Sequence, residues 1–202
     1  VDYLNKSYAA VSPFPDTASG GCRIPLKFVL AKRSPSGAAT NGIVRVDASS
    51  IPNYTAFGAN AAGSSGVDAQ TIMNFSRWNP SDYYNVYSVN KIDGNDLYSS
   101  GGIAGFAYFP GSPSIDGMIV CASQIKSGST TVAHEFGHSY NLYHTFEGDG
   151  GGGTCPPTTS CTTTGDRVCD TEPHKRSASY PGWCPPTDLN SCTGGSFKNV
   201  QN

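Results

Sequence analysis

The sequence predicts an α+β fold with an irregular C-terminal part that disulfides hold together. Over residues 1–144, short apolar runs of strand length alternate with helical patterns. After residue 144 the periodicity almost disappears, and five of the seven cysteines lie between Cys155 and Cys192. We therefore expect an upper subdomain over residues 1–144 and an irregular, cysteine-rich lower subdomain over residues 145–202.

The composition is that of a folded and nearly neutral chain. Its 202 residues carry a formal net charge of −2, and only 14% of them are charged. The 13 Lys and Arg residues form no basic block, which disfavours a nucleic-acid arm or a polybasic membrane patch. No apolar run approaches the roughly 18 residues of a membrane span. We expect a monomer without a nucleic-acid or membrane partner.

The first half of the chain contains patterns for two helices and two strands. Val1, Leu4 and Tyr8 have the spacing of one helix face, and the prolines and glycines that follow end this helix. Two further runs are apolar over the length of a strand. The expected elements are a helix ending near Tyr8, strands over Ile24–Ala31 and Ile43–Val46, a surface loop over residues 48–66, and a short helix over Val67–Phe75.

The second half adds three strands and one helix before the cysteine-rich segment. The strands are expected over Asn85–Val89, Ile103–Phe109 and Met118–Cys121. Glycines in and around the second of these suit a strand that another backbone approaches closely. Several residues that favour helix N-caps follow from Ser127, and they predict a helix that runs to about Tyr140.

The predicted helix carries the residues with the clearest chemistry. His134 and His138 are four residues apart, so both imidazoles lie on one helix face and suit Zn²⁺. Glu135 is offset from that face and could accept the proton of a water that the zinc acidifies. His144 could join only if the chain turns sharply after Tyr140, and Asn141 tolerates the positive φ of such a turn.

Two other interpretations of this segment remain open. A surface helix can carry two histidines and a glutamate by accident, although a third histidine at this distance makes accident less favoured. The zinc could also be a structural staple in a non-catalytic extracellular binding module. Three protein ligands leave the open position of a catalytic site, whereas a structural site has a fourth ligand. Glu135 favours catalysis, because a structural site has no use for a general base.

The stretch HEFGHSYNLYHTFEGD resembles the signature of the pappalysin-type metzincin metalloproteases, which include the cytophagalysins. The segments SDYYNVYSVNKIDG, GGIAGFAYFPG and GDRVCDTEP are similar to stretches of the same family. The resemblance implies a twisted mixed β-sheet with an active-site helix above the irregular lower subdomain. It also implies a secreted zinc endopeptidase with His134, His138 and His144 as zinc ligands and Glu135 as general base. A protein or peptide substrate would bind extended along Ile103–Phe109.

The same resemblance implies calcium near residues 165–171. The family binds calcium around a GDxVxDT segment, and the matching oxygen donors here are Asp166, Asp170 and the carbonyl of Thr171. The alternative is an acidic turn that holds no ion.

The sequence departs from the family at three places. Asn141 stands where the family has glycine, which the turn tolerates. Both methionines, Met73 and Met118, precede the histidine motif, so the family's methionine turn is missing, although residues 196–202 resemble its lead-in. The family's first strand and most of its first helix are also missing. We therefore expect a fragment of a catalytic domain that is cut at both ends.

The cysteines indicate an extracellular disulfide framework, because they lie in a loop-rich segment without a CxxC pair. A second zinc site built from cysteines is less favoured. The odd number fits a partner lost with the methionine turn, and spacing alone does not establish the pairing. The working hypothesis pairs Cys161 with Cys192, leaves Cys184 unpaired, and allows Cys155–Cys169 and Cys22–Cys121. His174 is expected to be a surface residue rather than a spare ligand.

Overall fold

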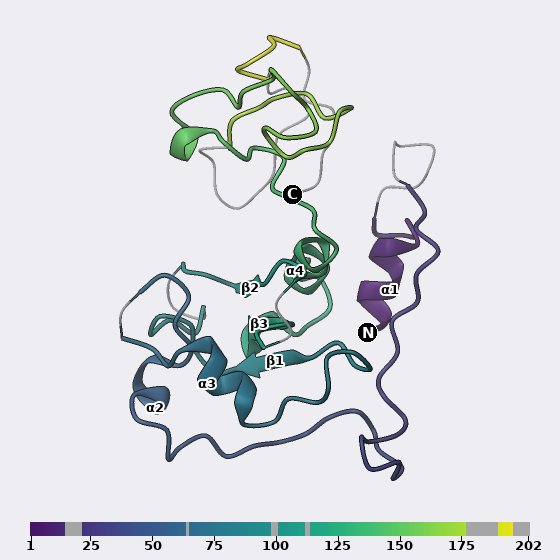
Figure 1. The fold of residues 1–202 in the computed structure, drawn as a ribbon, viewed down its shortest axis with the longest axis vertical. Coiled ribbons are helices and arrows are strands. Elements are labelled where there is room, and N and C mark those ends of the chain that lie inside the picture. The colour runs from purple at the N-terminus through teal and green to yellow at the C-terminus, as the bar shows by residue number, and fades with distance from the viewer. Residues whose placement is uncertain (15–21, 64, 98–100, 112–113, 177–189, 196–202) are drawn as a thin grey trace. The chain divides into compact units, whose positions relative to one another are not determined.

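The computed structural model describes residues 1–14, 22–63, 65–97, 101–111, 114–176 and 190–195, and all structural statements below concern these residues. The chain forms two compact units, Val1–Asn141 and Leu142–Asn202 (Figure 1). The first unit contains a sheet and helices, whereas the second consists mainly of turns and loops. The fold is therefore α+β, as the sequence predicts.

A three-stranded mixed sheet forms the centre of the first unit. Its strands are β1 (Val86–Val89), β2 (Gly105–Ala107) and β3 (Met118–Cys121), and β3 lies between the other two. β1 runs parallel to β3, while β2 runs antiparallel to it. All three strands were expected, but β2 is shorter than the predicted strand over Ile103–Phe109. β2 is thus an edge strand of this sheet.

Both faces of β3 are covered, which is why its sequence is apolar without alternation. Ile119 and Cys121 belong to one core cluster, together with Ile72 and Met73 of α3 (Ala69–Asn74). The side chains that alternate with these two along β3 point to the opposite face of the sheet. Met118 and Val120 pack in a second cluster with Leu4, Phe136 and neighbouring aromatic rings.

The remaining helices frame this sheet. Phe136 belongs to α4 (Thr131–Ser139), and Leu4 belongs to α1 (Asp2–Tyr8). The Tyr8 hydroxyl donates to the Ala133 carbonyl at 3.1 Å, which joins α1 to α4. Shorter elements are α2 (Tyr54–Phe57), which falls inside the predicted loop, and the 3₁₀ turns η2 (Ala122–Gln124) and η3 (Gly150–Gly152).

Two predicted strands, Ile24–Ala31 and Ile43–Val46, are wrong. Within the first, the Asn5 side chain occupies both backbone groups of Phe28: its amide donates to the carbonyl at 2.9 Å, and its oxygen accepts from the N–H at 2.7 Å. This segment therefore bonds to α1 and not to a sheet. In the second, the Asn41 side chain accepts from the Ile43 N–H at 3.0 Å and forms a local turn. Both segments leave apolar side chains exposed.

The second unit is held by two disulfides, as expected of its composition, but the predicted pairing is wrong. The bonds are Cys155–Cys192 and Cys161–Cys169, with Cα atoms 5.7 and 4.8 Å apart. Neither Cys161–Cys192 nor Cys155–Cys169 forms. Cys22 and Cys121 are free thiols, because one is exposed at the surface while the other is buried in the sheet. Cys184 lies outside the described residues.

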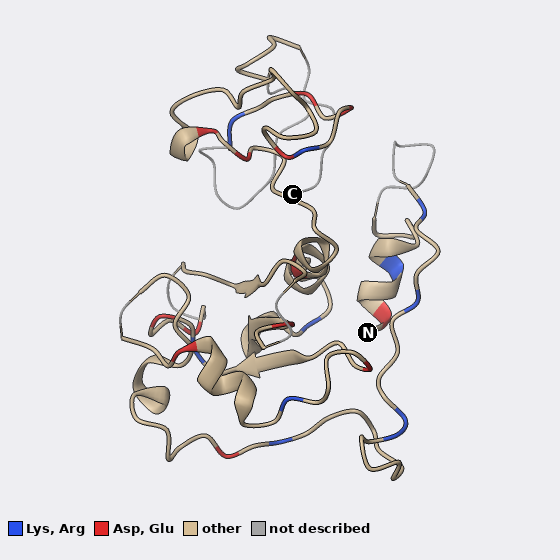
Figure 2. Ribbon diagram, in the orientation of Figure 1, with Lys and Arg blue, Asp and Glu red and all other residues tan. Residues whose placement is uncertain are grey.

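Charged side chains are spread thinly over the described chain. Figure 2 shows Lys and Arg on many separate segments of the ribbon and not gathered along one element. Among the described residues, we find no helix whose length and apolar character would let it cross a membrane.

Candidate metal centre

Helix α4 brings two imidazoles together. His134 and His138 lie one turn apart, and their Nε2 atoms are 3.1 Å from each other. Each of the three predicted histidines, His134, His138 and His144, offers a ligand atom, and these atoms all lie within 4.8 Å of one another. Among the described residues, this is the only group of three or more His, Cys, Asp or Glu side chains with such a geometry.

The donor set fits zinc. Imidazole nitrogens bind zinc at about 2.0–2.1 Å with tetrahedral angles, which places two such nitrogens about 3.4 Å apart. The separation of the two α4 nitrogens, 3.1 Å, is close to this value. Three histidines are also one of the ligand sets that catalytic zinc sites use.

The chain turns away from the helix at Asn141. α4 ends at Ser139, and Asn141 has φ of 67°, in the left-handed region. Its N–H donates to the His138 carbonyl at 2.9 Å and so satisfies one of the last carbonyls of the helix. This left-handed turn was predicted, because asparagine adopts positive φ more readily than other non-glycine residues.

Glu135 is buried on the side of α4 that faces β2. Its side chain is 4% exposed, and the Ala107 backbone N–H donates to its carboxylate. The other oxygen, Oε2, is buried without a hydrogen-bond partner. Burial raises the pKa of Glu135 to about 7, and the hydrogen bond from Ala107 opposes this rise. A buried carboxylate with one unpaired oxygen can bind a water or take up a proton.

Comparison with known proteins agrees with this arrangement. The profile of the peptidase M43 family, described as pregnancy-associated plasma protein-A, matches residues 66–202. The chain belongs to the peptidase M43 family. The match includes the histidine motif and extends over the whole cysteine-rich segment, so the M43 assignment covers more than a short signature.

Several curated relatives of this M43 chain are named extracellular metalloproteases. Extracellular metalloprotease 1 of Coccidioides posadasii is 34% identical over 132 residues, which are 58% of this chain and 40% of the relative. The extracellular metalloprotease of Colletotrichum graminicola is 37% identical over 89 residues, 37% of this chain and 28% of the relative. The extracellular metalloprotease of Arthroderma benhamiae is 29% identical over 156 residues, which are 71% of this chain and 47% of the relative. The chain thus spans less than half the length of these relatives.

Aromatic and hydroxyl groups surround α4 of the M43 chain. The Phe109 ring meets the His138 ring edge to face, with centroids 5.5 Å apart. The Ser139 hydroxyl donates to the Glu135 carbonyl at 3.0 Å and also contacts the Tyr84 hydroxyl. Burial raises the pKa of Tyr84, so this phenol stays neutral near pH 7. These contacts fix the helix that carries both histidines.

The predicted calcium residues lie in the second unit. Asp166, Asp170 and Thr171 all line one pocket of about 290 Å³. Asp166 is largely buried, and its side chain accepts from the Val168 N–H at 3.0 Å, whereas Asp170 is exposed. Within the described chain, these two carboxylates do not converge with a third His, Cys, Asp or Glu side chain. Calcium therefore stays a prediction.

Sequence reasoning missed several residues that contact the loop after α4. His174 is buried, not at the surface as expected, and its Nε2 lies 2.7 Å from the Thr145 hydroxyl. Phe146 stacks on His144, and Arg176 pairs with Asp149. Residues 150–173, which show no periodicity, separate His174 and Arg176 from their partners in sequence, so no local pattern could have revealed these contacts. Met73 and Met118 lie in the two core clusters, and residues 196–202 lie outside the described chain.

Proposed function

We propose that this M43 chain is a secreted zinc-dependent endopeptidase. Three imidazoles beside a buried carboxylate with an unpaired oxygen are the observation that carries this proposal. Membership in a peptidase family, and relatives named extracellular metalloproteases, support the same activity and location.

His134, His138 and His144 would hold the zinc ion. A bound zinc ion supplies Lewis-acid chemistry, because it polarises a carbonyl and lowers the pKa of a water to about 7. The three side chains form this group without a fourth His, Cys, Asp or Glu from the described residues, which favours an open coordination position over a structural staple. The alternative of a non-catalytic binding module requires a closed site.

Glu135 would act as general base and then as general acid. Its buried Oε2 can accept a proton from the attacking water and later deliver it to the leaving amine. A general base works best when its pKa is near the working pH. In the metal-free chain, burial raises the pKa of Glu135 to about 7. The hydrogen bond from the Ala107 amide orients the carboxylate.

The substrate would be an extended peptide that adds a strand beside β2. The residues on either side of β2 form backbone hydrogen bonds with β3 and the residue before it. The Ala104 carbonyl accepts from the Cys121 N–H at 2.9 Å, and the Tyr108 N–H donates to the Gly117 carbonyl at 3.3 Å. Backbone direction alternates along a strand, so the groups of Gly105 and Ala107 point away from β3. The Ala107 N–H already bonds Glu135. A peptide paired with Gly105 would therefore run next to the general base.

We further propose calcium binding in the pocket that Asp166, Asp170 and Thr171 line. Carboxylate and carbonyl oxygens are the donors that calcium prefers. Disulfides in the same unit support an oxidising, extracellular location.

The decisive experiment removes the carboxylate of Glu135. Glu135→Ala should lower cleavage of an unfolded protein substrate at least about a hundredfold, the usual contribution of a positioned general base. Zinc content, measured by elemental analysis, should stay near one ion per chain, because the three imidazoles are intact. The same analysis measures bound calcium.

Glu147→Gln is the matched control, because Glu147 is an exposed carboxylate whose Oε2 lies 4.0 Å from His144 Nδ1. This variant should cleave at nearly the rate of the unchanged chain. Full activity of Glu135→Ala would end the proposed mechanism. Loss of zinc and activity together in that variant would mean that Glu135 supports the site and does not perform the chemistry.

A further inference from the structure

The ring of His144 is supported from one side by a neighbour two residues away. The Phe146 ring stacks on it with an interplanar angle of 5° and a centroid distance of 4.9 Å. His144 follows the end of α4, so no helix determines the direction of its imidazole. The carboxylate of Glu147 is 4.0 Å from Nδ1, which is too far for a hydrogen bond. A parallel stack limits how far the imidazole can tilt.

Phe146 is in turn covered by a cation. The Arg176 guanidinium carbon lies 4.9 Å from the centroid of the Phe146 ring, within the range of a cation–π contact. The His174 ring meets Phe146 edge on, with centroids 6.3 Å apart. Phe146 is thus fixed between His144 and the segment that contains residues 174–176.

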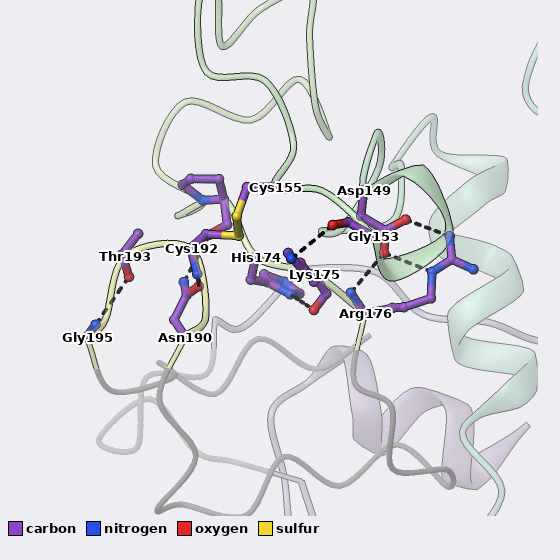
Figure 3. The surroundings of a disulfide bond; sticks show 11 residues. Asp149, Gly153, Cys155, His174, Lys175, Arg176, Asn190, Cys192, Thr193 and Gly195 are labelled. Carbon is purple, nitrogen blue, oxygen red and sulfur yellow. Dashed lines mark hydrogen bonds and ion pairs between the residues drawn. A yellow bond between two sulfur atoms is a disulfide. The ribbon is translucent and has the colours of Figure 1, made fainter.

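Arg176 is fixed by a buried carboxylate. The Asp149 side chain is 1% exposed, and its two oxygens accept from Arg176 Nε and a terminal nitrogen, each at 2.8 Å. Asp149 also accepts from the Arg176 and Gly151 backbone N–H groups at 3.0 Å. Figure 3 shows Asp149 and Arg176 facing each other, with the bonds between these two residues drawn. Hydrogen bonds from Arg176 lower the pKa of Asp149.

The residue next to His144 has a second anchor on the same segment. His174 Nδ1 lies 3.0 Å from the Lys175 carbonyl, and because a carbonyl only accepts, Nδ1 carries a proton. Its Nε2 lies 2.7 Å from the Thr145 hydroxyl. Residues 174–176 therefore contact the chain directly after His144 at both Thr145 and Phe146.

We propose that the Asp149–Arg176 pair positions His144 for metal binding through the ring of Phe146, and so sets the zinc affinity of the site. This inference rests on the proposed function, because it takes His144 as a zinc ligand. Arg176 and Phe146 are positioning residues: neither offers an atom to the metal. Asp149 and Arg176 are 27 positions apart in sequence, which makes this a tertiary contact, so the affinity depends on the folded second unit.

The geometry requires arginine and an aromatic ring at these positions. A guanidinium is planar and can bind both oxygens of Asp149 while its face lies against Phe146. Leucine at position 146 would keep apolar volume but present no flat face to the imidazole. Tyrosine would keep that face.

The test measures the zinc dissociation constant of the whole chain by competition with a chromophoric chelator. Arg176→Ala and Phe146→Leu should each weaken zinc binding about tenfold or more, the scale on which outer partners affect metal sites. The zinc dissociation constant of Phe146→Tyr should stay within about twofold of that of the unchanged chain. The absorption spectrum of the cobalt-substituted chain should change in the first two variants only, since it reports the ligand geometry.

Lys175→Ala is the matched control. It removes the hydrogen bond from Lys175 Nζ to the Gly153 carbonyl, 3.1 Å, in the same loop but without touching Phe146. Its zinc affinity and cobalt spectrum should equal those of the unchanged chain. If Arg176→Ala fails to fold, the comparison of Phe146→Leu with Phe146→Tyr decides.

Unaltered zinc affinity in both Arg176→Ala and Phe146→Leu would overturn this inference while the proposed function stands. The same holds if Phe146→Tyr binds zinc as weakly as Phe146→Leu. If the unchanged chain binds no zinc, the proposed function fails and this inference fails with it.

Discussion

At the scale of single residues, Glu135 combines deep burial with a carboxylate oxygen, Oε2, that has no hydrogen-bond partner among the described residues. A buried carboxylate with one unpaired oxygen costs free energy unless it takes up a proton. Strongly perturbed carboxyls of this kind cluster at functional sites. The charged form of Glu135 should therefore lower the free energy of unfolding of the metal-free chain by a measurable amount.

We predict that the stability of the metal-free chain falls between about pH 4.5 and pH 7. The pKa of Glu135 is higher in the folded chain, about 7, than its ordinary value of 4.5, so folding favours the protonated form. That contribution is fully present below pH 4.5 and is lost as the pH rises through 7. Gln in place of Glu135 stays neutral at every pH. At pH 8 the free energy of unfolding of Glu135→Gln should therefore be larger than that of the unchanged chain by on the order of 3 kcal/mol.

Urea denaturation at pH 5 and pH 8 gives the comparison. Glu147→Gln removes an exposed carboxylate. Its free energy of unfolding should equal that of the unchanged chain at both pH 5 and pH 8. An equal difference between Glu135→Gln and the unchanged chain at both pH values would contradict the assignment of the pH dependence to Glu135.

The residues that the sequence could predict are those that helix geometry relates directly. His134, Glu135 and His138 lie within one turn and a half, so their spacing alone indicates their placement on α4. The Ala107 amide and the Asp149–Arg176 pair come from distant segments. Their contacts depend on tertiary packing, which no local pattern reports.

At the scale of elements, the end of α4 determines where the chain goes after the second histidine. Asn141 has φ of 67°, a conformation that costs most residues about 1–2 kcal/mol and glycine almost nothing. The turn was predictable because asparagine is a common left-handed residue after a helix. The strands expected at Ile24–Ala31 and Ile43–Val46 do not form. The apolar runs did not reveal that a side chain such as Asn5 takes the backbone hydrogen bonds of Phe28.

We predict that Asn141→Val lowers both stability and zinc affinity, whereas Asn141→Gly preserves both. Valine is branched at Cβ and resists positive φ, so the helix end must distort and His144 moves with it. The loss of stability should be about 2 kcal/mol or more. Thermal unfolding and chelator competition on the two variants give the comparison, and equal behaviour of valine and glycine would refute the role of this turn.

At the scale of the whole molecule, the two units depend on different forces. The first unit has two core clusters on the faces of one sheet. The second has few regular elements and two disulfides. The sequence indicated this contrast through its cysteines, but their pairing was wrong, because spacing does not determine which loops meet.

We predict that the two disulfides stabilise the second unit unequally. Cys155–Cys192 joins residues 37 apart, whereas Cys161–Cys169 joins residues 8 apart. Loop-closure entropy makes their contributions about 4 and about 2.5 kcal/mol. Replacing each pair by serine and following hydrogen exchange of residues 142–176 should show the larger loss of protection without Cys155–Cys192. Equal losses, or a matching loss across residues 1–141, would contradict this picture.

The bond between Cys155 and Cys192 also has a practical consequence for judging whether a purified chain is intact. A cut anywhere between these two residues leaves the fragments joined covalently, so the chain keeps its apparent size on a gel run without reductant. Such a cut adds only the mass of one water, and it separates His174 and Arg176 from Asp149 if it falls between them. Samples intended for zinc titration should therefore be run on a gel with reductant, because a cleaved chain has the apparent size of an intact one without it.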